Sequence, residues 1–405
     1  MPINKSIVKS IETINDFLLK FEDLLSQDYS LEEGIKLNFE LSFYKHNSEK
    51  PSYLYLAKPK DARRIAYLYN SVYKGKYPYR EMQDPDEVLK LIKSRKYNWL
   101  LYKDTSGEIF GTMGFYLELE NKKAYLFGYV IDKKYWGKTN NLKPFIGSLI
   151  VLWRMYKNKI FLWYSETRTA HNKAQLGQII VGLKPIAFFP NKDLFYGKYE
   201  SEFLHVIYDK KLLNQFRSNK TPKVIRQVLN CYLFANKFYR LGKPIIRNPK
   251  IEVNRYDISS LDSKYVERVE MKFNVYEKIK LYFKNTTSYF QFTYNRENNS
   301  AENTKYSVNN LEELYFFLSK LKDIIALKRI RYFQCFVSSY NPDHQKLFLE
   351  YDFRPYGYIP GWNYNKKINL FEDCVVFIKI EGEINENLHL LPQTKKLLKT
   401  LNCLN

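Results

Sequence analysis

Cysteine, histidine and long hydrophobic runs are scarce in this sequence, and each shortage excludes a class of protein. Among the 405 residues are four cysteines and five histidines, scattered without Cys-x-x-Cys or other metal-ligand spacing. This pattern excludes a disulfide-stabilised secreted domain and a zinc site. We expect free thiols, a reducing compartment and no metal.

No apolar run approaches the ~20 residues that a membrane-spanning helix needs. The longest candidate covers residues 144–153 and is ended by Arg154. The first residues also lack the apolar core of a signal peptide. We therefore expect a cytoplasmic protein without a membrane partner.

Charge and hydrophobicity describe a large, basic, globular chain. A hydrophobic content of 45% and 405 residues predict two domains, each with its own core. The net charge of +22 has two interpretations. It favours a nucleic-acid or acidic-membrane partner, or it reflects lysines spread over the surface. Because no run of five basic residues occurs, nucleic acid is possible but not favoured.

The first hundred residues predict helices and strands in alternation. Apolar residues spaced by three and four predict one amphipathic helix over 5–26, and strict alternation predicts a strand over 35–43. Further elements are a partner strand at 53–57, helices from Pro59 to Tyr73 and from Asp84 to about Arg95, and strands at 97–103 and 109–119 joined by the turn 104–107.

The chemistry concentrates in residues 124–208. A strand at 124–131 precedes a basic loop at 132–141, a long helix beginning at about Leu142, and a second strand at 160–165. A strand, a glycine-containing loop and a helix in this order present backbone N–H groups and a helix N-terminus to a phosphate. Lysines 133, 134 and 138 add positive charge to that loop.

The segments that follow carry a resemblance to a known family. They are Glu166–Gln175, then Gly182-Leu-Lys-Pro185 leading to Pro190, then Glu200–Tyr208. With the preceding strand, loop and helix, they resemble in order the GNAT superfamily of acetyl-CoA-dependent N-acyltransferases, over about Tyr53 to Tyr208. The loop pattern of the family, [QR]-x-x-G-x-[GA], here reads Lys134-Tyr-Trp-Gly137-Lys-Thr139, with its first and last places substituted.

The resemblance implies an α/β (α+β) fold in which each GNAT-like domain is a mixed, mostly antiparallel twisted sheet flanked by helices. It implies an enzyme that moves an acetyl group from acetyl-CoA to a primary amine of a small molecule or amino acid, as a monomer or homodimer. The implied cofactor-binding residues are Tyr129, Val130, Ile131, Lys134, Trp136, Gly137, Lys138, Thr139, Asn140 and Asn172. Tyr77, Tyr79 and Tyr196 are substrate-binding candidates.

The catalytic residues are less clearly marked. The family often places a tyrosine acid where this sequence has Gln178, and the strand 124–131 carries no carboxylate to act as a base. Glu166 is then the candidate base, followed by His171, with Arg168 as an anchor for a substrate carboxylate or phosphate. A structural ion pair between Glu166 and Arg168, and a surface or N-cap role for His171, remain open alternatives.

An internal repeat relates the two halves of the chain. Strands are predicted to begin at Ile160 and Ile330, and 330 − 160 = 170. The same offset relates Gln175 to Gln345, Lys184-Pro185 to Arg354-Pro355, Pro190 to Pro360, and Glu202 to Glu372. This spacing predicts a duplicated domain. It also places Ser307 opposite Gly137, Thr304 opposite Lys134, Phe336 and Ser338 opposite Glu166 and Arg168, and Asn341 opposite His171.

The second copy therefore lacks the loop glycine and the candidate catalytic residues, as an inactive partner of an active domain would. The predicted organisation is an N-terminal helix and strand (1–50), an acetyltransferase domain (51–208), a helical connector (209–250), a degenerate copy (251–380) and a tail (381–405). The alternative is a non-catalytic GNAT-like binding protein, or an acetyltransferase of RNA or of protein lysine. A V-shaped opening between the strands at Ile131 and Ile160 would favour the small-molecule enzyme.

Overall fold

The computed structural model describes residues 11–25, 30–41, 52–137, 140–273 and 275–403. Contacts between Cα atoms group the chain into two compact units. The first unit holds Met1–Lys184, Phe195–Lys198 and Leu204–Gln215, and the second holds the remainder. Strands β7 (Lys184–Phe195) and β8 (Lys198–Tyr208) are thus divided between the units. The domain boundaries given by the sequence stay predictions.

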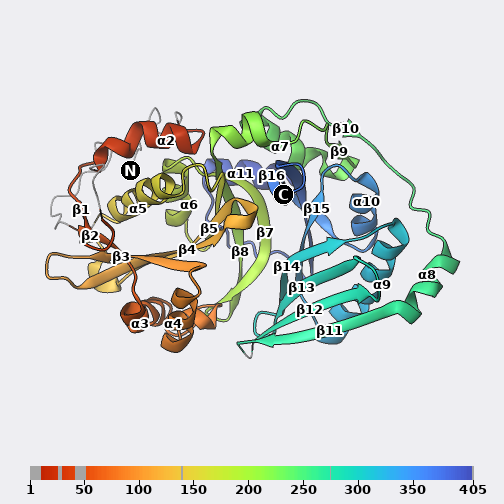
Figure 1. Cartoon of the computed structure of the whole chain (residues 1–405), viewed down its shortest axis with the longest axis horizontal. Coiled ribbons are helices and arrows are strands. Elements are labelled where there is room, and N and C mark those ends of the chain that lie inside the picture. Colours follow the sequence, from red (N-terminus) through yellow and green to blue (C-terminus); the bar gives the residue numbers. More distant parts are fainter. Residues whose placement is uncertain (1–10, 26–29, 42–51, 138–139, 274, 404–405) are drawn as a thin grey trace. The chain divides into compact units, whose positions relative to one another are not determined.

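The first unit is a mixed, mostly antiparallel sheet with helices on both faces (Figure 1). Its strands follow the order β1-β2-β3-β4-β5-β6-β8. Neighbouring strands from β1 to β5 are antiparallel, whereas β5 and β6 are parallel. The strands are β1 (Ile35–Leu37), β2 (Ser52–Leu56), β3 (Tyr97–Lys103), β4 (Ile109–Glu118), β5 (Lys123–Ile131) and β6 (Leu162–Arg168). The helices are α2 (Ile14–Phe21), α3 (Ala62–Tyr73), α4 (Pro85–Lys93), α5 (Leu142–Met155) and α6 (Lys173–Ile180).

Two hydrophobic clusters hold this sheet between its helices. Helices α2 and α5 pack on one face, where the Phe17 and Trp153 rings meet edge to face with centroids 4.5 Å apart. Helices α3 and α4 pack on the other face, where Ile65 and Val88 are buried against Trp99. Figure 1 shows α2 and α5 above the strands and α3 and α4 below them.

Several predicted elements are confirmed together with their causes. Asp84 caps α4 by accepting hydrogen bonds from the amides of Asp86 and Glu87. The hairpin between β3 and β4 closes through a bond of 3.0 Å from the Gly107 amide to the Asp104 carbonyl, with Gly107 at φ +82. Strand β2 pairs with β1 as expected, with Leu54 opposite Ile35.

Two predictions near the N-terminus are wrong in extent. The helix predicted over 5–26 does not include residues 11–13, because Thr13 is extended and caps α2 with a capping box to Asp16. The strand predicted over 35–43 ends at Leu37, although burial alternates without a break from Ile35 to Leu41. Residues 5–10 and 42–43 lie outside the described residues.

The second unit has a similar succession of elements. Its sheet runs β16-β17-β15-β14-β13-β12-β11, with only β14 and β15 parallel among these pairs. The strands are β11 (Tyr265–Lys272), β12 (Tyr276–Phe283), β13 (Tyr289–Asn295), β14 (Ser300–Ser307), β15 (Tyr332–Ser338), β16 (Arg354–Asn365) and β17 (Leu370–Ile380). The helices are α7 (Leu229–Tyr239), α8 (Arg255–Leu261), α9 (Leu311–Lys328), α10 (Pro342–Glu350) and α11 (Pro392–Thr400), and β9 (Lys223–Val224) pairs with β10 (Ile245–Ile246).

The predicted repeat agrees with some element positions and fails at others. Strands β15 and β16 begin 170 residues after β6 and β7. The offset fails before the long helices, because Thr304 and Ser307 lie within β14 and are not loop residues like Gly137. It also slips by one at the next helices, whose N-caps are Asn172 and Asn341.

The segment predicted as a helical connector is helical only in part. Leu212–Phe216 forms a π-helical turn, residues 217–225 are not helical, and α7 is the only longer helix within 209–250, all of which the structure describes. Pro222 interrupts the apolar periodicity there, and the short strand β9 follows it. None of the described helices is long and apolar enough to cross a membrane. The four cysteines are free thiols.

Acidification is expected to destabilise the second unit through His344 on α10. Its Nδ1 lies 3.2 Å from the Tyr306 hydroxyl, and burial lowers the pKa of His344 to about 4. The unfolded chain takes up this proton near pH 6.5. The neutral ring therefore makes its full contribution to the free energy of unfolding above pH 6.5, and this contribution is lost as the pH falls toward 4. Between pH 7.5 and pH 5 the free energy of unfolding should fall by about 2 kcal/mol. Urea unfolding of the wild type and His344→Gln at both pH values measures this. An equal loss in both proteins would contradict the assignment.

Candidate functional site

Strands β5 and β6 pair for only part of their length. Their register runs from Lys123 opposite Leu162 to Leu126 opposite Ser165. Both strands then continue, to Ile131 and Arg168, and no further pair joins them although both are fully described. The predicted opening between the two strands thus begins beyond Leu126 and Ser165. Ile160, at which the second strand was predicted to begin, precedes β6 and does not border the opening. The N–H and C=O groups of residues 127–131 that point away from β4 have no strand partner there.

A β-bulge at Gly128 accompanies the divergence. Thr112 pairs with Val130 and Gly114 with Phe127, so β5 has one residue more than β4 in this interval. Gly128 has φ +55, and its carbonyl accepts a hydrogen bond of 3.0 Å from the Tyr69 hydroxyl on α3. An added Cβ would lie 2.0 Å from that hydroxyl oxygen. Glycine is therefore required for α3 to reach the free edge of β5.

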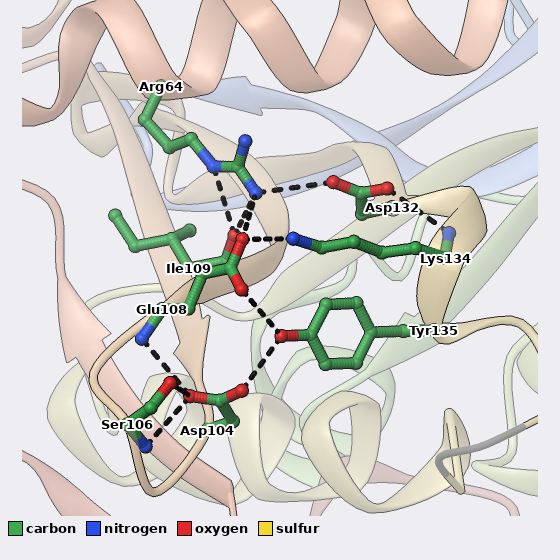
Figure 2. A network of polar contacts seen from close by, with 8 residues as sticks. All are labelled: Arg64, Asp104, Ser106, Glu108, Ile109, Asp132, Lys134 and Tyr135. Atoms are coloured by element: carbon green, nitrogen blue, oxygen red, sulfur yellow. Dashed lines mark hydrogen bonds and ion pairs between the residues drawn. The ribbon is translucent and has the colours of Figure 1, made fainter.

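The loop that follows β5 begins with a network of polar contacts (Figure 2). Asp132 accepts a bond of 3.2 Å from the Lys134 amide and lies 3.2 Å from Arg64. The ammonium of Lys134, a predicted cofactor ligand, is paired with Glu108, and this bond lowers the pKa of the Glu108 carboxyl. Two carboxylates beside Lys134 make this end of the loop a poor place for an anion.

The loop meets α5 at Gly137 and Asn140. Gly137 has φ +74, and an added Cβ would meet no atom within 4 Å, so its backbone is open to close approach. Asn140 is buried, and its Oδ1 accepts from the Leu142 amide at 3.0 Å. Among the described residues its Nδ2 has no hydrogen-bond partner. The first turn of α5 contains no acidic residue. Lys138 and Thr139 lie outside the described residues.

The end of β5 is tied to the loop and to α5. The Tyr129 hydroxyl donates to the Asn141 carbonyl at 2.5 Å. The Trp136 indole N–H donates to the Ile131 carbonyl at 2.9 Å, although its ring is 54% exposed. Val130 is buried in the hydrophobic cluster that α3 and α4 form with the sheet. Of the predicted cofactor residues, Trp136 of the loop is thus brought to Ile131 of β5, and Tyr129 is brought to the start of α5.

Two further buried polar atoms lie beside the diverging strands. Ser165 Oγ and Gln178 Oε1 have no hydrogen-bond partner within the described part of the chain. Ser165 is the last residue of β6 that pairs with β5. Gln178 lies one turn beyond Gln175, whose side chain donates to the Arg168 carbonyl at 3.3 Å. Because an unpaired buried polar atom costs about 1–3 kcal/mol, these atoms indicate a place for a ligand.

Glu166 lies within β6, since this strand extends beyond its predicted end at Ser165 to Arg168. Its carboxylate accepts a hydrogen bond of 3.1 Å from the Tyr125 hydroxyl on β5. Glu166 and Arg168 share one face of the strand because they are two residues apart. His171 and Asn172 are exposed in the turn before α6, and Asn172, not His171, is the N-cap residue.

An aromatic cluster surrounds Arg168. Its guanidinium lies 3.7 Å from the Phe195 ring centroid, and the rings of Tyr73 and Tyr196 are at 5.9 and 6.0 Å. The Tyr77 ring adjoins that of Tyr73 at 4.6 Å and that of Tyr79 at 5.7 Å. The structure therefore gathers all three predicted substrate residues with Arg168. The aromatic cluster is defined as Tyr73, Tyr77, Tyr79, Phe195 and Tyr196.

Sequence reasoning missed Tyr69, Tyr73 and Phe195. The Tyr69 ring lies 5.1 Å from that of Tyr77, so Tyr69 joins the aromatic cluster to the bulge at Gly128. A signal for Tyr69 and Tyr73 was present, because a spacing of four residues brings them to one side of the helix that ends just before Tyr77. Phe195 had no such signal.

The corresponding helix start in the second unit is occupied by its own side chains. Three residues separate β14 from α9, and the N-cap Asn310 accepts from the Glu313 amide at 3.0 Å. The buried Glu313 carboxylate accepts from the Asn309 amide at 2.7 Å and from the Ser288 hydroxyl at 2.6 Å. An anion cannot approach this helix N-terminus without meeting that carboxylate.

Comparisons with known proteins give structural likenesses only. No family model matches the chain, and no curated protein matches its sequence. A ribosomal-protein-S5-alanine acetyltransferase from Vibrio fischeri has a TM-score of 0.34 and 16% identity, over 42% of this chain and 98% of its own. The values for a dodecameric spermidine N-acetyltransferase from Vibrio cholerae are 0.34, 16%, 40% and 97%. Those for the microcin C7 self-immunity acetyltransferase MccE, solved with acetyl-CoA and AMP, are 0.31, 16%, 39% and 92%.

Proposed function

We propose that the first unit transfers an acetyl group from acetyl-CoA to a primary amine, as a GNAT-type N-acetyltransferase. The observation that carries the proposal is the start of α5. Gly137 leaves its backbone open there, and the buried Asn140 amide has no partner within the described residues. The start of α5 lies beside the part of β5 that does not pair with β6, because the Tyr129 hydroxyl bonds the Asn141 carbonyl. A helix N-terminus beside an open strand edge suits a diphosphate that continues into an extended amide-containing arm.

The residues present fit acetyl-CoA. The amides from Gly137 to Asn140 would hold its diphosphate, with Lys138 and Thr139 as further ligands in this proposal, whereas the Trp136 amide already donates to the Lys133 carbonyl at 3.1 Å. The free edge of residues 127–131 would bond the amides of its pantetheine arm, as a neighbouring strand would. Ser165 Oγ and Gln178 Oε1 offer one polar atom each toward that arm. When bound, acetyl-CoA supplies the acyl group as an activated thioester.

The side chains divide the remaining tasks. Glu166 would accept the proton of the attacking amine, and a backbone N–H of β5 that points away from β4 would stabilise the oxyanion. Gln178 stands where a tyrosine acid is expected, and an amide can donate a hydrogen bond but no proton. The leaving thiolate would therefore take its proton from water or from the amine. In this proposal the second unit is a degenerate copy, because Glu313 fills the place of the anion.

A pair of matched substitutions tests where acetyl-CoA binds. Asn140→Asp places a carboxylate at the start of α5, where it would repel a diphosphate. We expect acetyl-CoA to bind the wild type and to bind this variant ~10–100-fold more weakly, as two like charges a few ångströms apart repel by a few kcal/mol. The control is Asn310→Asp, the same change at the N-cap of α9. Calorimetric titration measures both, and an equal effect of the two changes would refute the assignment to the first unit.

The aromatic cluster indicates the kind of acceptor. The guanidinium of Arg168 lies 3.7 Å from the centroid of the Phe195 ring, and a guanidinium beside aromatic rings suits a carboxylate or phosphate on the substrate. We expect Arg168→Ala to raise KM about tenfold for amines that carry such a group, without changing acetyl-CoA affinity. The control is Arg63→Ala on the exposed side of α3. An equal rise in KM for anionic and uncharged amines would argue against an anion anchor.

A further inference from the structure

One face of the sheet in the second unit lacks the pair of helices that covers one face of the sheet in the first unit. In the first unit, α3 and α4 lie between β2 and β3 in the chain and pack on the sheet. In the second unit, residues 273–275 join β11 directly to β12, so the chain forms no such helix pair there. Helix α9 covers the opposite face, where the rings of Phe283 and Phe317 stack with centroids 4.6 Å apart.

The strand registers show which side chains share the uncovered face. One row across the sheet consists of Arg268, Lys280, Gln291 and Lys305, and the row beside it places Tyr282 opposite Tyr289. On the other side of the basic row, Lys278 and then Tyr276 follow on the same face of β12. Each of these side chains is half-buried or exposed. The open face is defined as Arg268, Lys280, Lys305, Tyr276, Tyr282 and Tyr289.

We propose that the open face binds single-stranded nucleic acid. The ammonium of Lys280 lies 5.3 Å from the Tyr282 ring centroid and 5.2 Å from that of Tyr289, so charge and aromatic surface adjoin. Within the described residues, no carboxylate pairs with Arg268, Lys280 or Lys305.

Acidic side chains do not cancel the basic row. Glu302, which lies on the neighbouring row of β14, is paired with the buried Lys192 at 3.1 Å. Glu270 lies opposite Lys278 on that same row. The net charge of +22 adds long-range attraction for a polyanion.

The combination favours a single strand over other polyanions. Phosphates suit a row of basic side chains, and unstacked bases suit flat tyrosine rings on a sheet, where each stacked base adds measurable affinity. In duplex DNA the bases are stacked on one another and so cannot stack on tyrosine rings, whereas the bases of a single strand can. An acidic peptide would engage the basic row but would make no use of the tyrosines. The inference goes beyond acetyl transfer and does not depend on it.

Fluorescence anisotropy with a labelled single-stranded RNA of about 12 nucleotides tests the proposal on the full chain without acetyl-CoA. The triple variant Arg268→Ala, Lys280→Ala, Lys305→Ala should raise Kd at least tenfold. Its plot of log K against log salt should be shallower by about 2, because three phosphate contacts are lost. The matched control removes three exposed charges elsewhere in the second unit, with Lys322→Ala, Lys395→Ala, Lys396→Ala, and should change Kd less than about twofold.

The tyrosines separate a nucleic-acid site from a general polyanion surface. The double variant Tyr282→Ala, Tyr289→Ala should weaken RNA binding roughly tenfold or more and leave the salt slope unchanged. Circular dichroism checks that each variant is folded. Equal losses in the two triple variants, full affinity in the tyrosine variant, or equally strong binding of polyglutamate would each overturn the proposal.

Discussion

Replacing Gly137 by tryptophan is expected to abolish measurable binding of acetyl-CoA, with a rise in Kd of at least about 100-fold. Nothing lies within 4 Å of a Cβ at this position, so the indole would find room in the protein. It would fill the space through which a diphosphate must approach the amides before α5. The measurement is calorimetric titration of acetyl-CoA into the wild type and the variant.

Two companion variants separate blockage from backbone strain. Gly137→Ala forces the same φ of +74 on a residue with a Cβ, which costs about 1–2 kcal/mol locally, but leaves the approach nearly open. It should weaken binding less than about tenfold. Gly382→Trp changes a glycine of similar φ, +81, with equally free surroundings, at the end of the second sheet, and should bind as the wild type does. Equal affinity of Gly137→Trp and wild type would remove the loop from the site.

Much of the first sheet was predictable, because each element carries a local signal. Alternation identified the pairing of β1 with β2, and Asp84 before Pro85 identified the start of α4. The start of α2 after Thr13 was less visible, because the apolar spacing extends back to Ile11 while the capping box of Thr13 and Asp16 begins the helix only at Ile14. Periodicity reports which side chains are buried, and caps decide where a helix begins.

The candidate site was predictable in its backbone and less so in its side chains. The strand, loop and helix around Gly137 follow from their order in the sequence. The aromatic cluster did not, because Phe195 comes from β7 and meets Arg168 only through the fold. The ion pair of Lys134 with Glu108 also joins residues far apart in sequence. Long-range partners of this kind leave no pattern in a single sequence.

The starts of α5 and α9 differ in what satisfies their N-termini. Helix α5 follows β5, and α9 follows β14. Each of these strands pairs with its parallel neighbour, β6 or β15, over only a few residues. At α9, the internal carboxylate of Glu313 satisfies the N-terminus, and Ser288 and Asn309 complete its hydrogen bonds. At α5, the buried Asn140 amide is left without a partner among the described residues. The difference between these two helix starts is thus local and electrostatic.

Replacing Glu166 by glutamine is expected to lower kcat by about 10²–10³-fold while leaving acetyl-CoA affinity unchanged. Glutamine keeps an oxygen that accepts the bond of 3.1 Å from Tyr125, so the packing between β5 and β6 is preserved and only the basic group is lost. The matched control is Glu118→Gln, because Glu118 also accepts from a tyrosine, Tyr164, at 3.1 Å.

Glu118 lies opposite Lys123, the first residue of β5. There β5 and β6 are still paired, so Glu118 lies away from the opening between them. The control should therefore keep its turnover. Steady-state rates at saturating acetyl-CoA, together with titration of acetyl-CoA into each variant, separate proton transfer from binding. An unchanged rate in Glu166→Gln would make Glu166 a structural partner of Tyr125, and the amine would then lose its proton to water.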